Sequence, residues 1–465
     1  MERKNAWAGR SEAELAQIEA MSKAYCAYID AGKTERECVT VSEKLSQEKG
    51  FANLADCIRE NRALAAGDRV YRAWMGKCFV AFVLGRHPLS EGMNIVGAHI
   101  DSPRIDIKQN PLYEEEDFAY LDTHYYGGIK KYQWLAMPLA LHGVIAKKDG
   151  TVVIVSVGER DDEPVFCITD LLPHLAAEQM SKTAKDLIEG EALNVLIGGR
   201  PLEGEEKEPV KAGVLKLLRE QYGVEEEDFL SAELEVVPAG RAREVGFDRS
   251  MIMAYGHDDR VCAYPSLAAV LDFEGVPEYT LCCVLTDKEE IGSVGATGMD
   301  SRFFENIVAE LCALAGEPGD LALRRTLGNS RMLSSDVSAG FDPAFAQVFE
   351  KKNAAFLGRG VCFNKFTGSR GKGGSNDANA EYIASLRRIM DDAGVAFQTA
   401  ELGRVDVGGG GTIAYMCAKY GMNVIDSGIP VLSMHAPYEV ISKVDLYEGY
   451  RCYCAFLRDA GPVEG

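Results

Sequence analysis

The sequence lacks the features that mark membrane and exported proteins. Its 465 residues contain no run of eighteen consecutive apolar residues, and the first stretch, MERKNAWAGRSEAELAQIEAM, has charges with no apolar segment behind them. These absences argue against a membrane-spanning helix and against an export signal. We therefore expect a cytoplasmic protein.

Disulfide spacing and an excess of basic charge are missing too. The thirteen cysteines form no CxxC pair, and two of them, Cys282 and Cys283, lie inside an apolar run. This usage is typical of buried, reduced thiols. The formal net charge is −21. Nucleic acids and anionic membranes would be repelled by that charge, so we expect neither as a partner.

Three well-known catalytic motifs are also absent. The chain has no GxxxxGK[ST] phosphate loop, no GxSxG elbow and no HExxH helix. Interpretations as a nucleotide-binding enzyme, a serine hydrolase or a thermolysin-like peptidase therefore lose support.

What is present indicates two domains. A chain of 465 residues exceeds the size at which one core keeps growing. Residues 11–48 have helical spacing, CFVAFVLG and MNIVGAHID have strand character, and strands alternate with helices after residue 250. This order predicts an α/β fold with a mainly parallel sheet sandwiched by helices, formed by residues 1–104 and 251–465. The last helix, which begins at SKVD, is expected to have a capping box of Ser442 and Asp445.

Residues 105–250 differ from the rest in their pattern. They combine strands such as TVVIVSV with the acidic tract VEEEDF and with the charged stretch EGEEKEPVKAG, which we expect to form a loop. We predict that this segment is a β-rich domain inserted into the first one.

Polar residues follow the strands of the alternating region. The stretches concerned contain His99 and Asp101 in GAHIDSPR; His257, Asp258 and Asp259 in YGHDDRVCAY; Glu289 and Glu290 after YTLCCVL; Asp336 in LSSD; and His435 in IPVLSMHAPYE. In a parallel sheet, such residues meet at the ligand-binding edge. Imidazole and carboxylate ligands suit Zn²⁺, Co²⁺ or Mn²⁺. One ligand from each of the five stretches would exceed the three protein ligands that a single catalytic zinc usually has, which indicates two ions that share a bridging carboxylate.

The adjacent acids Glu289 and Glu290 can be interpreted in two ways. An isolated Glu-Glu pair is most often a solvated turn. At the end of a strand, however, successive side chains point in opposite directions, so one carboxylate could hold a metal while the other moves protons. The joint placement of the other polar residues favours the second interpretation.

Together, five stretches resemble the M18 metallopeptidases, the aspartyl aminopeptidase family. They are AHIDSPR, YGHDDRVCAY, LTDKEEIGSVGATG, LSSDVSAGFDP and LSMHAPYE, and the likeness runs from about Leu15 to Leu457. Where the family usually has Asp-Asn, this chain has Asp258-Asp259, which is closer to the M42 aminopeptidases. The resemblance implies a zinc-peptidase-like catalytic domain, an inserted dimerisation domain, and removal of N-terminal residues from peptides by metal-activated water.

The resemblance also implies roles for single residues. The implied metal ligands are Asp258 as the bridge, His99 and Asp336 at one ion, and Glu290 and His435 at the other. Glu289 would be the general base, and Asp101 would hold the His99 ring in its metal-binding tautomer. His174 in ITDLLPHLA would reach a neighbouring subunit's site and steady the oxyanion; the other possibility is a histidine on a helix surface. The peptide bond from Asp258 to Asp259 is expected to be cis.

Further expectations concern ligands and assembly. The resemblance implies two divalent ions per subunit, most readily Zn²⁺ with Co²⁺ or Mn²⁺ possible, and a tetrahedral dodecamer built from dimers that admits short peptides with a free N-terminus. Arg370 and Lys372 are the nearest basic candidates for selecting acidic substrates. Glycines 408–411 form either a tight turn, which we favour, or a close approach to substrate.

Two other functions remain as alternatives. A co-catalytic zinc deacylase or carboxypeptidase of similar architecture would cleave N-acetylated or C-terminally labelled peptides. A non-enzymatic, self-assembling shell would require metal ligands to be missing, and all five are present.

Overall fold

The computed structural model describes residues 4–368 and 371–463, which fold into two compact units. The first unit comprises Met1–Asp101, Ala242–Met434 and Glu439–Gly465, and the second comprises Ser102–Arg241 and His435–Tyr438. The second unit begins at Ser102, three residues before the predicted boundary at 105, and the first unit resumes at Ala242, nine residues before the predicted boundary at 251. The structure also assigns the short stretch that begins with His435 to the second unit, which the sequence did not indicate.

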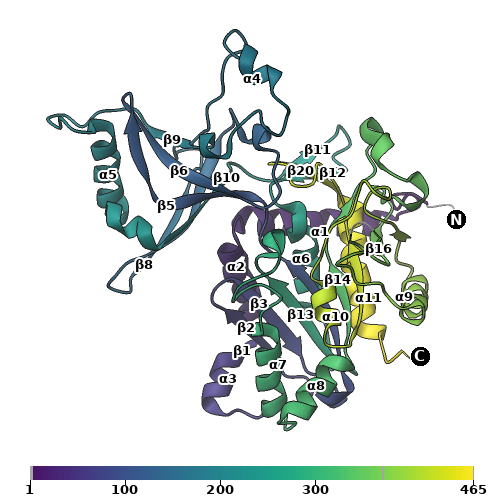
Figure 1. Cartoon of the computed structure of the whole chain (residues 1–465). Helices are drawn as coiled ribbons and strands as arrows, with labels where there is room; N and C mark the ends of the chain where they lie inside the picture. Colours follow the sequence, from purple (N-terminus) through teal and green to yellow (C-terminus); the bar gives the residue numbers. More distant parts are fainter. Residues whose placement is uncertain (1–3, 369–370, 464–465) are drawn as a thin grey trace. The chain divides into compact units, whose positions relative to one another are not determined.

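The first unit is built on a nine-stranded sheet (Figure 1). The strands in spatial order are β1 (Ala52–Asn53), β2 (Arg69–Trp74), β3 (Cys78–Val83), β13 (Thr280–Thr286), β4 (Met93–His99), β14 (Arg331–Ser335), β18 (Asn423–Gly428), β16 (Val361–Asn364) and β17 (Phe397–Thr399). The central strands β13, β4, β14 and β18 run parallel, whereas β3 and β16 are antiparallel to their neighbours in that group. The sheet is therefore mixed around a parallel centre. The parallel centre aligns the carboxyl ends of the four strands at one edge.

Helices and two apolar cores cover the sheet on both faces. The helices of this unit are α1 (Glu12–Ala31), α2 (Glu35–Glu48), α3 (Leu54–Glu60), α6 (His257–Leu271), α7 (Phe303–Leu314), α8 (Asp320–Gly328), α9 (Ala380–Asp392), α10 (Ala414–Ala418) and α11 (Lys443–Asp459). One core includes Phe79 with residues of α1, α6, α9 and α11; the other includes Phe82 with residues of α3, α7, α8 and α10. Because successive strand residues point into different cores, both must be apolar, which explains the continuous apolar runs in the sequence.

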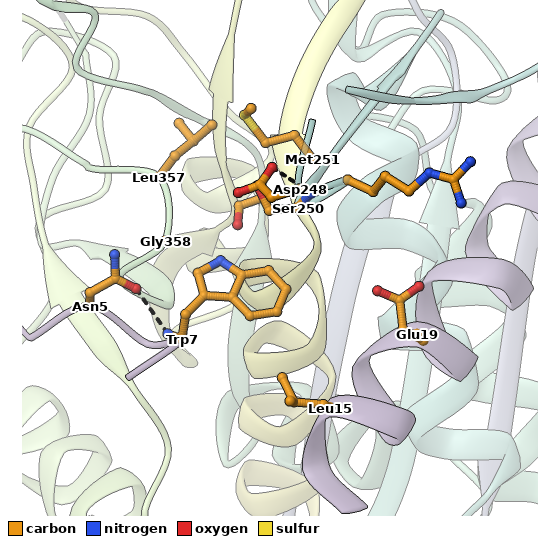
Figure 2. Close-up of a pocket in the computed structure, with 11 residues that line it drawn as sticks. Asn5, Trp7, Leu15, Glu19, Asp248, Ser250, Met251, Leu357 and Gly358 are labelled. Carbon is orange, nitrogen blue, oxygen red and sulfur yellow. Dashed lines mark hydrogen bonds between the residues drawn. The ribbon is translucent and has the colours of Figure 1, made fainter. Parts of the chain in front are cut away.

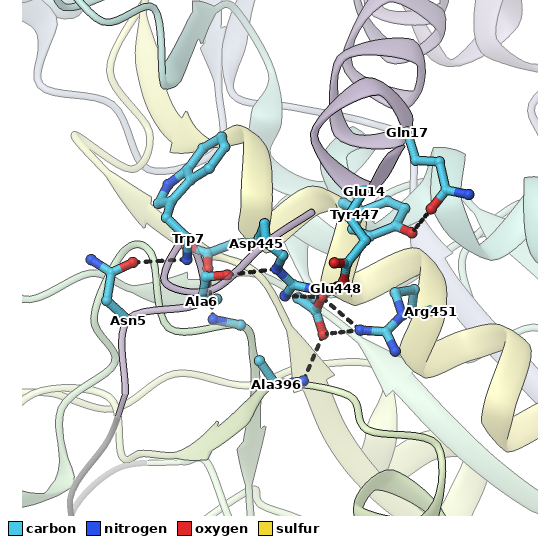
Figure 3. Close-up of polar contacts among 12 residues, drawn as sticks. Asn5, Ala6, Trp7, Glu14, Gln17, Ala396, Asp445, Tyr447, Glu448 and Arg451 are labelled. Carbon is cyan, nitrogen blue, oxygen red and sulfur yellow. Dashed lines mark hydrogen bonds and ion pairs between the residues drawn. The ribbon is translucent and has the colours of Figure 1, made fainter. Parts of the chain in front are cut away.

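The structure shows how the first and the last helix begin. Helix α1 begins with a capping box formed by Ser11 and Glu14. The capping box predicted for α11 is wrong, because the Ser442 side chain makes no capping bond. The carboxylate of Asp445 instead accepts hydrogen bonds from the backbone of Gly358 at 2.6 Å and Gly360 at 2.7 Å. Figure 3 shows this region, where Asp445 and Glu448 of α11 face the amino-terminal segment.

A small five-stranded sheet completes the first unit. Its strands in order are β11 (Arg243–Val245), β12 (Met251–Ala254), β20 (Glu439–Ser442), β19 (Pro430–Leu432) and β15 (Ser338–Ala339). Strand β12 leads into α6 through Tyr255 and Gly256. The small sheet therefore sets where α6 begins, and α6 carries three of the residues predicted at the site, His257, Asp258 and Asp259.

The second unit contains a six-stranded sheet in which every pairing is antiparallel. Its strands in order are β8 (Val152–Val157), β7 (Leu139–Ala146), β10 (Ala232–Pro238), β5 (Arg104–Glu115), β6 (Phe118–Tyr126) and β9 (Val195–Gly198), and its helices are α4 (Ala177–Ser181) and α5 (Pro209–Tyr222). The loop expected for EGEEKEPVKAG is only partly correct, because α5 begins inside it. Pro209 occupies the first turn of α5, where its fixed φ angle favours a helix start.

The structure can be compared with the expectations of reduced cysteines and of no membrane-spanning helix. All thirteen cysteines are free thiols, and ten are buried, whereas Cys26, Cys167 and Cys454 are partly buried. Among the residues that the structure describes, no helix combines the length and the apolar character needed to cross a bilayer.

Candidate metal centre

The cluster of predicted site residues in the first unit forms at the carboxyl edge of the parallel strands. His99 is the last residue of β4, and Thr286, which pairs with it, is the last residue of β13. Glu289 and Glu290 follow β13 in the 3₁₀ helix η5 (Glu289–Ile291), and Asp336 follows β14. Asp258 belongs to the first turn of α6. Strand ends and a helix start thus bring together residues far apart in the sequence.

The side chains at this edge approach one another closely enough to share a cation. The Nε2 atom of His99 lies 3.2 Å from Oδ1 of Asp258 and 3.9 Å from Oε2 of Glu289. Three overlapping groups each have their ligand atoms within 4.8 Å of one another: His99 with Glu289 and Asp336; His99 with Asp258 and Glu290; and Asp258 with Asp259 and Asp336. Two neighbouring ions with shared ligands would match this overlap.

Asp101 holds the other members of the cluster in place. Its carbonyl oxygen lies 2.9 Å from Nδ1 of His99, and its carboxylate lies 3.3 Å from the same atom. Both groups are acceptors, so Nδ1 carries the proton and Nε2 faces the carboxylates. The same carboxylate accepts hydrogen bonds from the backbone of Glu289 at 3.1 Å and Glu290 at 3.2 Å. One buried aspartate therefore orients the imidazole and the turn with both glutamates.

The electrostatics of the cluster favour added positive charge. Burial, together with the neighbouring carboxylates, raises the pKa of Asp336 well above its ordinary value, and burial likewise raises the pKa of Asp259. For His99, burial disfavours the proton, but hydrogen bonds to Asp101 and Asp258 outweigh it and raise the imidazole pKa. The carboxylates of the cluster thus outnumber its imidazole, and an added cation would reduce the repulsion among them.

The residues present fit a divalent metal. The ligand atoms are carboxylate oxygens and one imidazole nitrogen, a set that suits Zn²⁺, Co²⁺ or Mn²⁺. The carboxylate of Asp259 is fully buried, and the hydrogen bonds that favour its charge, from the Cys262 thiol and the His99 backbone, do not outweigh the burial that raises its pKa. Buried carboxylates in such surroundings are normally paired or bound to a metal, and a cation would meet that need.

One residue beside this cluster, Glu439, was missed by the sequence reasoning. Asp259, which was expected at this edge, joins the group with Asp258 and Asp336, and the peptide bond between Asp258 and Asp259 is cis, as predicted. Glu439 is buried and accepts a hydrogen bond from the backbone of Asp258 at 2.9 Å. Its position in LSMHAPYE, close to His435, was the only available signal.

The two remaining predicted histidines belong to the second unit. The Nδ1 atom of His435 lies 3.0 Å from the carbonyl oxygen of Gly128, so that nitrogen donates and the tautomer is the one that can ligate through Nε2. His174 is exposed and precedes α4, so it is not a histidine on the surface of that helix. The roles of both residues stay predictions.

Other sequence candidates have ordinary structural positions. His257 is buried between the hydroxyl of Tyr25, at 2.6 Å, and the carbonyl of Ile252, at 3.1 Å, and burial lowers its pKa to about 3. Lys372 pairs with Asp377 at 2.9 Å, and Arg370 lies outside the described residues.

The turn predicted for glycines 408–411 lies just before them instead. Residues 405–407 form the turn, and the Gly408 backbone closes it by donating to the carbonyl of Arg404 at 3.0 Å.

The arrangement matches a known family. The family model described as Aminopeptidase I zinc metalloprotease (M18) matches residues 28–457. The chain belongs to the M18 family. The resemblance read from the five sequence stretches is thereby confirmed.

Relatives of this aminopeptidase agree over its whole length. It is 56% identical over 459 residues to the probable M18 family aminopeptidase 1 of Clostridium acetobutylicum, a match that covers 98% of each chain. The crystal structure of the M18 family aminopeptidase from Thermotoga maritima superposes with a TM-score of 0.94 at 45% identity, covering 99% of this chain and 100% of that one. The protein is therefore a metal-dependent aminopeptidase, a hydrolase that acts on peptides, and the shell alternative is set aside.

A more distant solved structure shares the fold. The mApe1 dodecamer of S. cerevisiae superposes with a TM-score of 0.75 at 20% identity, covering 96% of this chain and 97% of that one. At this identity, the likeness establishes an α/β fold in common.

Proposed function

We propose that this aminopeptidase works with two divalent metal ions, Zn²⁺ in preference to Co²⁺ or Mn²⁺. The proposed ligands are Asp258 as the bridge, His99 and Asp336 at one ion, and Glu290 and His435 at the other. When bound, the ions would supply Lewis acidity to a water molecule and a binding point for the substrate's α-amino group. The observation that carries the proposal is the group of buried and partly buried imidazole and carboxylates at the carboxyl edge.

Glu289 is the proposed general base. Its side chain is 16% exposed, whereas that of Asp258 is 4% exposed and that of His99 is 2% exposed. A residue that takes a proton from water and delivers it to the leaving amine must reach both. Glu289 has that access, and the hydrogen bond from its backbone to Asp101 fixes where its side chain starts.

The test is hydrolysis of matched free-amino and N-acetylated aminoacyl anilides. The enzyme is stripped with a chelator and then supplied with Zn²⁺, Co²⁺ or Mn²⁺, and bound metal is counted by mass spectrometry. We expect metal-dependent release from free-amino substrates, with two ions bound per subunit at full activity. Cleavage of acetylated substrates alone would favour the deacylase, and full activity with a single bound ion would contradict the two-ion site.

The second unit is the proposed dimerisation domain, with a dodecamer built from such dimers. Strand β8 is an outer strand of its sheet, and it exposes Val152 (56%) and Ile154 (73%). An exposed apolar edge strand without proline or charge is rare in a monomer, because such edges pair with other chains. This edge supports a second copy as its partner.

The register of β8 gives the contact a definite geometry. Lys147 donates its backbone N–H to the carbonyl of Thr151 at 2.8 Å, which makes this a hydrogen-bonded position of the β7–β8 pair. Because such positions alternate, Val152, Ile154 and Ser156 direct their N–H and C=O groups away from β7. Antiparallel pairing of two copies about Ile154 would satisfy these groups in both chains.

Light scattering after gel filtration tests this contact. Ile154→Pro removes the central donor and should shift the assembly toward smaller species, whereas Ile154→Val, the matched control, should leave it unchanged. An unaltered mass for the proline variant, with a native circular dichroism spectrum, would exclude β8 as the dimer contact.

His174 is proposed to act in a neighbouring subunit's site and to steady the oxyanion there. Co-expression of differently tagged His174→Ala and Glu289→Gln chains tests this, since mixed assemblies would contain some complete sites. We expect purified mixed assemblies to be clearly more active than either parent. Activity no higher than that of the parents would remove His174 from the mechanism. A cytoplasmic location also belongs to the proposal, and the thirteen free thiols support it.

A further inference from the structure

Arg331 is a buried cation at the edge of the sheet opposite the metal centre. It is the first residue of β14, whereas Asp336 follows the last. Five strand residues separate the two ends by about 16 Å. Arg331 is 2% exposed, and its burial is unusual because arginine is seldom fully buried without a partner.

The contacts of Arg331 leave most of its guanidinium group unsatisfied. Nε donates to Oδ1 of Asn94, and the group lies 4.2 Å from the ring centroid of Tyr279. Nη1 and Nη2 are buried and make no hydrogen bond with the described residues. No carboxylate of the described chain forms an ion pair with Arg331, and none is among the groups that influence its pKa.

Arg331 remains charged in these surroundings. Burial lowers its pKa, but a guanidinium starts so far above neutrality that it stays protonated. A buried charge without a counter-charge is costly, and proteins normally pair it. The neutral amide of Asn94 and the aromatic ring of Tyr279 provide only part of the electrostatic stabilisation that an anion would give the guanidinium.

Arg331 also lines a cavity of about 340 Å³. The other lining residues include Asn329, Ser330 and Asn423, and the cavity therefore offers polar groups beside the arginine. Glu91 is the acidic residue of the lining, and its carboxylate lies 2.9 Å from Nδ1 of His87. The volume accommodates a small anion with its remaining water.

A larger cavity in the same unit differs, because the charged side chains that line it have partners within the chain. Figure 2 shows this cavity of about 660 Å³, which is lined by Trp7, Glu19, Asp248 and Arg249 among others. Its charged side chains already have partners in the chain: Glu19 with Lys443 at 2.8 Å, Arg249 with Glu244 at 3.2 Å, and Asp248 with Ser250 at 3.0 Å. Size alone therefore does not indicate a ligand there.

We propose that Arg331 and its polar cavity bind a small oxyanion of the phosphate or carboxylate class. Nη1 and Nη2 lie side by side in the planar guanidinium, which is the geometry that holds two oxygens of such an anion. The anion neutralises the buried charge. It also reinforces the contact with Asn94, whose side-chain amide donates to the carbonyls of Leu457 and Ala460 at the end of α11.

Thermal unfolding of the intact enzyme at constant ionic strength tests the site. Phosphate and acetate are titrated separately against sodium chloride, using wild type, Arg331→Met and the control Arg325→Gln, which alters an exposed arginine of α8. We expect a saturable rise in Tm for wild type and the control. The apparent affinity should fall about tenfold or more in Arg331→Met, the loss expected when a charge-assisted bond is removed.

The variants distinguish this site from anion binding at the metal centre. Phosphate bound at the metal centre would raise the Tm of wild type and Arg331→Met equally, and that result would overturn the proposal, as would the absence of any response in wild type. If Arg331→Met does not fold, Arg331→Lys retains the charge without the planar pair of nitrogens, and its affinity should fall between the two. A response to phosphate alone would fix the class of anion, and a response to both would fix the shared oxyanion chemistry.

Discussion

The two edges of the central sheet contain buried charges of opposite sign. At the carboxyl edge, Asp258, Asp259 and Asp336 surround the single imidazole of His99, whereas at the amino edge Arg331 has no carboxylate partner among the described residues. A protein interior penalises both arrangements for the same reason. The comparison teaches that a charge that is buried, and not compensated by the chain itself, indicates where a ligand of the opposite sign belongs.

The strongest test of the carboxyl edge is Glu289→Gln. If Glu289 moves protons while the other carboxylates hold metal, kcat should fall about 10²- to 10⁴-fold. Metal content should stay at the wild-type value. The measurement is steady-state hydrolysis of a free-amino anilide, with metal analysis of the same sample.

The matched control for this variant is Glu310→Gln, on the exposed face of α7. It should leave kcat unchanged. Loss of metal in Glu289→Gln would instead indicate that Glu289 is a metal ligand, and the proposed distinction between Glu289 as general base and Glu290 as ligand would be wrong.

A smaller effect is expected for Asp101→Asn. The carboxylate of Asp101 accepts hydrogen bonds from the His99 ring and from the Glu289 and Glu290 backbone. An amide has only one accepting oxygen, so the variant loses part of these hydrogen bonds. Partners that orient metal ligands typically contribute about 10- to 100-fold to metal affinity or activity. Competition with a chelating dye gives the affinity, and kcat at saturating metal gives the activity.

The control for Asp101→Asn is Asp392→Asn, an exposed acid at the end of α9. If the two variants behave alike, Asp101 has no special role in positioning the cluster.

Asp445 provides a third case, in which protons and backbone groups compensate a buried acid. Burial raises its pKa to about 7, despite hydrogen bonds from the Gly358 and Gly360 backbone. An unfolded aspartate titrates near pH 4. The folded state therefore binds the extra proton between about pH 4 and 7, and this contribution to the free energy of unfolding is lost as the pH rises, by at most about 1.4 kcal/mol per pH unit.

Asp445→Asn should remove that slope. The free energy of unfolding of the variant, measured with urea from pH 5 to pH 7, should rise relative to wild type as the pH increases. A difference between the two proteins that is independent of pH would show that Asp445 is already ionised at pH 5.

The smallest expected effect concerns the amino edge and Asn94→Asp. This change places a carboxylate beside Nε of Arg331, where the amide oxygen now lies at 2.5 Å. An internal counter-charge should reduce the rise in Tm produced by phosphate, at the cost of the hydrogen bonds to the end of α11. An undiminished rise in Tm with phosphate would show that the anion does not bind beside the pair of Asn94 and Arg331.

Much of the fold and of the first-unit cluster was visible in the sequence for clear physical reasons. Strands buried on both faces give continuous apolar runs, so β4 and β13 were identified, and the polar residues that follow them were expected at one edge. The pattern did not reveal how short β17 is, because a run such as AFQTAELG carries no signal for where pairing stops.

The remaining features depend on partners that are distant in the sequence. Asp445 fits a local capping box, yet its hydrogen bonds go to Gly358 and Gly360, and no local rule predicts them. Glu439 and Asp259 acquire their places only when β20 and α6 meet the strand ends. Arg331 looks like an ordinary residue at the start of a strand, and only the structure shows that its guanidinium is buried without a carboxylate.

The pattern of free thiols has a practical consequence for measuring motion. Among the cysteines, only Cys26, Cys167 and Cys454 are partly accessible, and burial raises the pKa of Cys26 and of Cys454 to about 11. Thiolates react with maleimides and thiols do not, so these two should label slowly near neutral pH. Cys167 belongs to the second unit, and it offers a native attachment point for a single spectroscopic probe. A second probe at an engineered cysteine in the first unit would then report distances between the units during turnover, with few native cysteines to remove.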